Sequence, residues 1–209
     1  MIQLKTDAIK VFESLSIPEA KALSIFGRIT DCYSESHRSY HNLRHIREML
    51  ETIFLYKENI VDYSLLYIAC LYHDIFYDTH ANDNEEKSYE YLKKDFSEYL
   101  SSEQIEKCGK LILGTKTHQF LQDDFDNKIF LDSDLLILGR ERNRYIEYMD
   151  SIRKEYDWVE REIYKTERSK ILKKFLERNR IYFTDEIYSK YEKEARENLN
   201  FEIEMYFQK

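Results

Sequence analysis

The chain has 209 residues, of which 43% are hydrophobic and 15% aromatic, so it is long enough to bury a full core in one domain. Its formal net charge of −8 opposes a nucleic-acid-binding surface, which requires a basic footprint, and no nucleic-acid partner is expected. The longest apolar run is far shorter than the roughly 20 residues of a membrane span, no secretory signal pattern precedes Asp7, and the three cysteines lack paired metal-ligand spacing; we therefore expect a cytoplasmic protein with reduced thiols.

Residues that form turns are scarce, since the sequence holds only four glycines and one proline. This favours long helices joined by short polar connections, and the predicted fold class is all-α. Apolar residues at helical intervals predict helices over residues 2–15 and 18–33, with Pro18 in a first turn. A third helix is expected to begin near Asn42, which is a good N-cap. Its apolar face would comprise Leu43, Ile46, Leu50, Ile53 and Phe54.

Residues 63–76 are almost continuously apolar, which predicts a central helix surrounded by the others. His73 and Asp74 stand near its end and would therefore point into the protein. A buried carboxylate beside an imidazole costs free energy unless a cation compensates it, and a metal ion is the simplest such cation. This pair is the strongest indication of a functional site.

A polar connection follows at residues 78–84. Asp83 and Glu86 have the spacing of a capping box, which would start a helix that runs to about Leu100.

Two further helices are expected before the C-terminal part. One covers residues 102–113 and would end at Gly114, and a polar loop follows at 119–127. The other is a second buried helix over residues 129–138, which Gly139 would end as a C-cap.

Residues 141–209 are predicted to form a charge-rich series of amphipathic helices. Their core-like positions are Tyr145, Tyr148, Ile152, Tyr156, Val159, Ile163, Leu172, Phe175 and Leu176.

Three segments carry histidines and carboxylates that would supply one site: residues 40–45 (YHNLRH), 72–78 (YHDIFYD) and 130–135 (FLDSDL). This order, a His, then His-Asp, then a distant Asp, resembles the HD superfamily of metal-dependent phosphohydrolases. With residues 83–88 (DNEEKS) and 194–199 (EARENL), the set is similar to small stand-alone bacterial proteins described as predicted HD phosphohydrolases.

The likeness runs over most of the chain. It implies a compact helical core like that of the phosphodiesterases at about 40–140, with additional helices at about 141–209, in a single domain over 1–209.

The resemblance also implies that His45, His73, Asp74 and Asp134 hold a divalent ion, and this ligand set suits Mn, Fe, Co, Ni, Zn or Mg. Asp132 and Asp134 cannot both face one site from a helix, because residues two apart point about 200° away from each other. We favour Asp134, which precedes an apolar residue as the superfamily's last Asp does. Asp132 would cap the helix or hydrogen-bond a ligand histidine.

His41 matches the proton-donor position of the cyclic nucleotide phosphodiesterases, whose first metal-binding helix resembles residues 40–45. An imidazole titrates near neutrality and suits that work. The alternative is that His41 only hydrogen-bonds a turn.

Further candidates lie outside these positions. Glu85 would orient water or hold a second metal, and Asp78 and Asn84 belong to the similar motifs. His118 and Lys116 would face a second metal or a phosphate from the loop after Gly114, although for Lys116 a solvated loop is the favoured reading.

The predicted function is that of a metal-dependent phosphohydrolase acting on a small phosphomonoester or phosphodiester, with a nucleotide favoured. Asp74 would take the proton of a metal-activated water, and His41 would protonate the departing oxygen. Two alternatives remain: a nonenzymatic nucleotide or metabolite sensor, and a di-iron oxygenase that uses Glu85 and His118. No oligomeric state is predicted.

Overall fold

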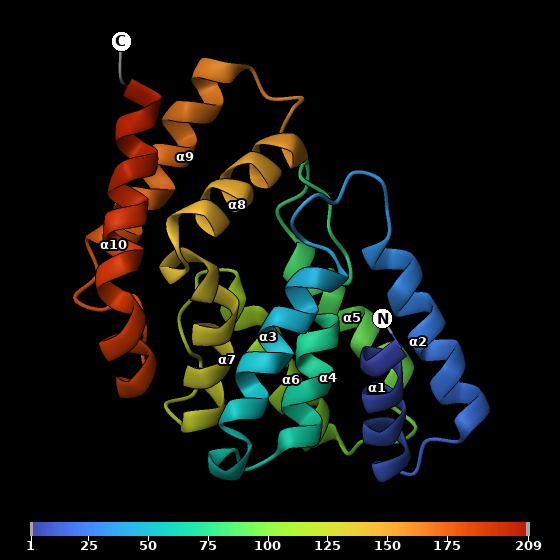
Figure 1. The fold of residues 1–209 in the computed structure, drawn as a ribbon. Helices are drawn as coiled ribbons and strands as arrows, with labels where there is room; N and C mark the ends of the chain where they lie inside the picture. Colours follow the sequence, from blue (N-terminus) through green and yellow to red (C-terminus); the bar gives the residue numbers. More distant parts are fainter. Residues whose placement is uncertain (1, 208–209) are drawn as a thin grey trace. The chain divides into compact units, whose positions relative to one another are not determined.

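The computed structural model describes residues 2–207, and its regular structure over that range consists of ten α-helices and two short 3₁₀ helices (Figure 1). The prediction of an all-α chain is confirmed. None of the helices in this part of the chain has both the length and the apolar character needed to cross a membrane.

The chain divides into two compact units, Met1–Ser133 and Asp134–Lys209. The helices of the first unit are α1 (Ile2–Ser14), α2 (Glu19–Tyr33), α3 (Leu43–Leu55), η1 (Lys57–Asn59), α4 (Tyr63–Tyr72), α5 (Asn84–Phe96), α6 (Ser102–Thr115) and most of α7 (Phe125–Leu135). Those of the second unit are η2 (Leu136–Gly139), α8 (Arg142–Glu155), α9 (Arg161–Leu176) and α10 (Asp185–Phe207). That the whole chain is one domain stays a prediction.

Helix α4 lies at the centre of the first unit, where α1, α3, α5 and α6 pack against it (Figure 1). Every residue from Leu65 to Tyr72 is buried, as its continuous apolar sequence predicts. The prediction that this helix reaches Phe76 is wrong. It ends at Tyr72. Beyond that residue the Ile75 N–H bonds the Tyr72 carbonyl, and the carbonyls of Asp74 and Ile75 accept from Arg38.

Helix α3 begins as predicted, since the Asn42 side chain accepts a hydrogen bond from the Arg44 N–H at 2.8 Å. The predicted burial of Phe54 is wrong, because this residue is 60% exposed. The buried face of α3 is centred on Met49 and Ile53, and Phe54 lies about 100° further round the helix from Ile53.

The capping box predicted for α5 does not form. Asp83 makes no side-chain cap bond and instead pairs with Lys87 at 2.8 Å, while Glu86 pairs with Lys116. A capping box forms at α6 instead, where Ser101 and Gln104 bond each other's main-chain N–H groups.

Two predicted ends in this region are also wrong. Helix α5 ends at Phe96 rather than near Leu100, and α6 continues through Gly114 to Thr115. The Gly114 carbonyl accepts from the N–H of Gln119, and a Cβ on Gly114 would lie 3.2 Å from the carbonyl oxygen of Gln119. A glycine therefore lets the returning loop approach the helix closely.

Helix α7 starts at Phe125, four residues before the predicted start at Ile129, and passes into η2 at Leu136. Gly139 is the last residue of η2 rather than a C-cap with positive φ. A Cβ on Gly139 would meet Tyr191 Cβ at 2.7 Å, so the position needs a glycine for packing.

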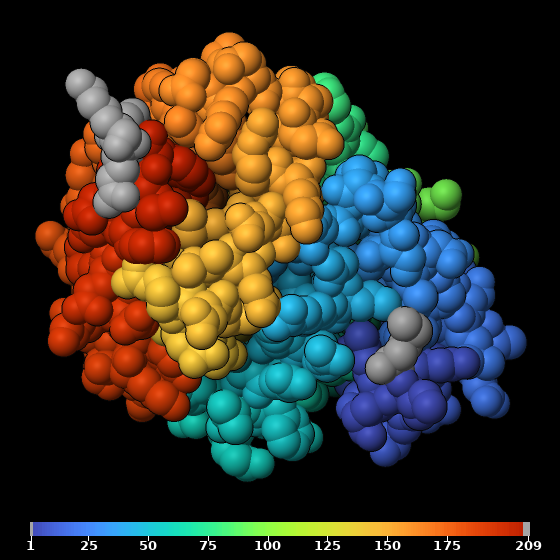
Figure 2. All heavy atoms as spheres, turned by 45° about the horizontal axis from the view of Figure 1, so that its top comes forward, coloured from blue at the N-terminus to red at the C-terminus, as the bar shows by residue number. Residues whose placement is uncertain are grey.

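In the second unit, α8, α9 and α10 lie next to one another at the surface (Figure 2, yellow to red). Tyr145, Tyr148, Ile152 and Leu172 are buried as predicted, whereas the other predicted positions are half-buried except for one. That exception is Ile163, which is 57% exposed because the neighbouring Tyr164 takes the buried position on α9.

Candidate metal centre

Three side chains of the first unit converge where α3 approaches the end of α4. His45 Nε2 lies 3.2 Å from His73 Nε2, and His73 Nε2 lies 3.0 Å from Asp74 Oδ2. One ligand atom from each residue lies within 4.8 Å of the others. His45 and His73 are buried, and the Asp74 side chain is 15% exposed, so the cluster retains access from solvent at the carboxylate.

The protonation of His73 follows from a main-chain contact. Its Nδ1 lies 2.9 Å from the carbonyl oxygen of Cys70, and a carbonyl can only accept, so Nδ1 carries a proton. In the neutral ring, Nε2 then has a lone pair that faces Asp74 Oδ2. Two electron-rich atoms at this distance attract each other only if a proton or a metal ion lies between them.

His73 and Asp74 are consecutive residues at the end of α4. Successive residues of a helix point about 100° apart, so the two side chains approach their common point from different directions. The helix ends at Tyr72, and the Ile75 N–H bonds the Tyr72 carbonyl in a tight turn. The His73 backbone keeps α-helical angles (φ −60°, ψ −34°), and the Asp74 carboxylate lies against the His73 ring, with Oδ2 3.0 Å from Nε2.

The donor set and its spacing fit a divalent ion. Bonds of about 2.0–2.1 Å to imidazole nitrogen and carboxylate oxygen place adjacent ligand atoms about 2.8–3.4 Å apart. The separations of 3.2 Å and 3.0 Å fall in that range. Imidazole and carboxylate together suit first-row transition metals, and three protein ligands leave room for water or substrate.

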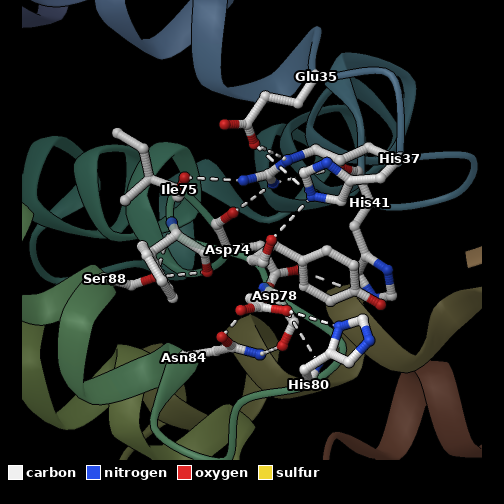
Figure 3. Close-up of polar contacts among 12 residues, drawn as sticks. Glu35, His37, His41, Asp74, Ile75, Asp78, His80, Asn84 and Ser88 are labelled. Carbon is white, nitrogen blue, oxygen red and sulfur yellow. Dashed lines mark hydrogen bonds and ion pairs between the residues drawn. The ribbon is translucent and has the colours of Figure 1, made fainter.

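His41 lies beside this cluster, with Nε2 4.0 Å from the same Asp74 oxygen, Oδ2 (Figure 3). Its ring stacks on the Tyr77 ring, with centroids 4.2 Å apart and planes at 30°. Its side chain is 21% exposed, so it is accessible to a bound molecule. Tyr77 is a contact that the sequence did not reveal.

Arg38 is a second residue that the sequence did not reveal. Its side chain is 1% exposed, and its guanidinium donates to the carbonyl oxygens of Asp74 and Ile75 at 2.6 and 2.8 Å (Figure 3). An isolated arginine between helices has no periodic signal. The residues next to it in the sequence, from Ser34 to Ser39, are all polar and give no hint of burial.

The two aspartates of α7 differ in burial. Asp132 is fully buried inside α7, so its predicted role as an N-cap is wrong; Asp124 instead accepts from the Asn127 N–H at 2.8 Å where that helix starts. A hydrogen bond from a ligand histidine to Asp132 stays a prediction. Asp134 is half-buried and begins the second unit, and its role as fourth ligand also stays a prediction.

Asp78 and Asn84 close the connection between α4 and α5. The Asn84 side chain donates to the Asp78 carbonyl at 3.0 Å and accepts from its N–H at 3.1 Å (Figure 3). An Asp78 carboxylate oxygen accepts from the His80 N–H at 2.9 Å, and this hydrogen bond lowers the pKa of Asp78. Both residues therefore have a structural role in this loop.

The remaining predicted candidates lie in different settings. Burial raises the pKa of Glu85, and the negative charge of Asp74 raises it further, which places Glu85 within electrostatic range of the cluster. Lys116 donates to Glu86 and to the Asn82 carbonyl at 2.8 Å, so its ammonium is engaged in holding the start of α5. His118 turns the chain after α6 with a positive φ of 47°.

No family model, curated protein or solved structure matches the chain.

Proposed function

We propose that this protein is a metal-dependent phosphohydrolase of the HD type, acting on a small phosphomonoester or phosphodiester, with a nucleotide favoured. The observation that carries the proposal is the convergence of His45 Nε2, His73 Nε2 and Asp74 Oδ2, with the His73 proton held on the far side of the ring. His41 beside the same carboxylate adds a group that can give a proton.

His45, His73 and Asp74 would hold the ion, with Asp134 as the predicted fourth ligand. When bound, a divalent ion supplies Lewis acidity that polarises a phosphoryl oxygen and makes water a better nucleophile near neutral pH. The accessible edge of Asp74 takes the proton of the attacking water. His41 Nε2 gives a proton to the departing oxygen, while stacking on Tyr77 keeps the imidazole in one orientation.

The test is a screen of the metal-loaded protein. Chelator-stripped protein is reloaded with Mn²⁺, Co²⁺, Fe²⁺, Ni²⁺, Zn²⁺ or Mg²⁺ and offered nucleoside monophosphates, cyclic nucleotides and other small phosphoesters, with phosphate or nucleoside release as the readout. We expect turnover that requires the ion and is absent from His73→Ala. Turnover that stays at the rate of the metal-loaded wild type in the stripped protein or in His73→Ala would contradict the proposal.

A second candidate function is a di-iron oxygenase, which the position of Glu85 favours. This carboxylate is half-buried, and burial and then the negative charge of Asp74 raise its pKa, so the two carboxylates lie close enough to interact. Two iron ions per chain with oxygen consumption would support this function. One ion with phosphate release supports the hydrolase, and nucleotide binding without either reaction supports a sensor.

A further inference from the structure

Arg38 lies in the connection between α2 and α3 and reaches across to the turn that carries Asp74. Its Nη1 donates to the Asp74 carbonyl at 2.6 Å and to the His41 carbonyl at 3.3 Å. Its Nη2 donates to the Ile75 carbonyl at 2.8 Å. Nη1 therefore links the main chain of His41, the predicted proton donor, to the main chain of Asp74, a predicted metal ligand.

The rest of the guanidinium is also fixed. Its Nε donates to a Glu35 carboxylate oxygen at 2.9 Å, which balances the charge (Figure 3). The guanidinium carbon, Cζ, lies over the rings of Tyr33 and Tyr77, 5.0 and 5.5 Å from their centroids. The planar fork thus has a single orientation, and Tyr77, on which His41 stacks, is part of the same assembly.

The hydrogen bonds from Arg38 to the Asp74 and Ile75 carbonyls take the place of the main-chain bonds that these carbonyls would accept if α4 continued. The carbonyl groups of Asp74 and Ile75 lie beyond the end of α4 at Tyr72, and main-chain carbonyls removed from water need a donor. Arg38 donates to both carbonyls, so it binds the main chain of the turn in which Asp74 Oδ2 lies 3.0 Å from His73 Nε2.

We propose that Arg38 is a positioning residue: by binding the main chain at both Asp74 and His41 it fixes the metal ligand and the proton donor relative to each other. The part that concerns His41 rests on the proposed function, whereas the part that concerns Asp74 rests on metal binding alone. Metal affinity and proton donation both depend on this one side chain.

A matched control exists in the second unit. Arg153, near the end of α8, donates to the carbonyls of Tyr156 and Val159 at 2.5 and 3.0 Å and lies over the Tyr164 ring. Like Arg38, Arg153 donates to main-chain carbonyls that follow a helix, but neither carbonyl belongs to a predicted site residue. Arg153→Met therefore measures the stability lost when such an arginine is removed.

The experiment compares Arg38→Met, Arg38→Lys and Arg153→Met as full-length, chelator-stripped proteins titrated with Co²⁺ and followed by its visible absorption. Removing a group that orients a metal ligand typically weakens metal binding about 10–100-fold, and we expect that loss in Arg38→Met. Arg153→Met should bind Co²⁺ as tightly as the wild type, although both variants melt at a lower temperature.

Arg38→Lys keeps the protein interpretable if Arg38→Met fails to fold. Lysine preserves the charge and the aliphatic stem, but a single ammonium cannot reproduce the fixed fork across three carbonyls. We expect a folded protein by circular dichroism that binds Co²⁺ more weakly than the wild type. At saturating Co²⁺, its rate deficit should be larger for an alkyl phosphoester than for a nitrophenyl ester, because only the former needs the displaced His41.

Wild-type Co²⁺ affinity in Arg38→Lys, or an equal loss of affinity in Arg38→Met and Arg153→Met, would overturn the inference. A wild-type protein that binds Co²⁺ but hydrolyses no phosphoester would contradict the proposed function alone, since the affinity comparison does not require turnover. A wild-type protein that binds no Co²⁺ would contradict both.

Discussion

Glu202 in α10 and Asp74 in the turn after α4 are both acids largely removed from water, but their surroundings differ. The Glu202 side chain is fully buried, and each of its oxygens accepts two hydrogen bonds. Arg168 of α9 donates to both oxygens, Tyr145 of α8 donates at 2.5 Å, and Tyr206 donates at 2.6 Å. The carboxylate therefore links the three helices of the second unit.

The negative charge of Glu202 is balanced by the positive charge of Arg168. Burial opposes ionisation of Glu202, but the charge of Arg168 and the hydrogen bonds to the carboxylate outweigh burial, and the pKa of Glu202 is lowered. Burial raises the pKa of Tyr145, as does the neighbouring charge of Glu202, so its phenol stays protonated and donates. These side chains form an ion pair with matched donors, which is a structural arrangement.

The contacts around Asp74 are of another kind. Its Oδ2 faces the Nε2 atoms of His73 and His41, and His73 Nε2 in turn faces His45 Nε2. Arginine is present here too, but Arg38 binds the Asp74 carbonyl rather than its carboxylate. The two acids thus differ in the groups that face the carboxylate: an arginine is paired with Glu202, whereas histidine nitrogens face Asp74, as the proposed metal site requires.

The largest effect that would test this contrast is loss of the bound ion. We expect Asp74→Ala and His73→Ala each to lower the content of transition metal in purified protein, because each removes one converging ligand atom. Glu202→Gln should leave the content unchanged. Plasma mass spectrometry measures it, and full occupancy in both site variants would show that the cluster is a hydrogen-bonded core instead.

The second prediction concerns the two aspartates of α7. We expect Asp134→Asn to abolish metal-dependent turnover, since an amide is a poor substitute for an anionic ligand, and Asp132→Asn to reduce it less. A paired assay of the two variants at equal metal concentration provides the measurement. The reverse order would make the fully buried Asp132 the ligand.

Local sequence predicted the parts of the fold that local interactions determine. The apolar run of α4 and the N-cap Asn42 depend on neighbouring residues, and both are as expected. The ends of helices were predicted less well because distant groups determine them. Arg38 captures the carbonyls after α4, and Lys116, 30 residues away, takes the Glu86 carboxylate that a capping box would have used.

The candidate site shows the same division. The order of the histidines and Asp74 in the sequence was enough to group them, and the structure brings His45, His73 and Asp74 together. Arg38 was not predicted, because its role depends on where α4 ends and on how the 34–42 connection crosses that end. Neither the end of α4 nor the path of this connection follows from the spacing of residues in the sequence.

The third prediction separates chemistry from ligation. His41→Ala should keep its metal, because His41 lies outside the group of three converging ligands. Loss of a general acid typically costs about 10²–10⁴-fold in rate. The deficit should shrink for a nitrophenyl phosphate ester, whose leaving group departs without a proton. Equal deficits on alkyl and nitrophenyl substrates would reject the acid role, and loss of the ion would make His41 a ligand.

The smallest effect on the site, and a sizeable one on stability, is expected from Glu202→Gln. Neutralising this carboxylate leaves Arg168 buried without its counter-ion, and breaking a buried pair in this way costs about 3–5 kcal/mol of unfolding free energy. Asp185→Asn, at the exposed ion pair with Arg180, is the matched control and should change stability little.

The pH dependence of the same variant tests the cause. Because the pKa of Glu202 is lowered on folding, its contribution to stability is fully present above the ordinary pKa of a glutamate and is lost as pH falls through the lowered value. Wild-type protein should therefore lose stability on acidification across that window, and Glu202→Gln should lose less. Urea unfolding followed by circular dichroism at neutral and acidic pH measures both quantities. If the two proteins lose equal stability on acidification, the ionised Glu202 carboxylate does not stabilise the cluster around Arg168. Glu202 would then not be the stabilising ion pair with which Asp74 is compared.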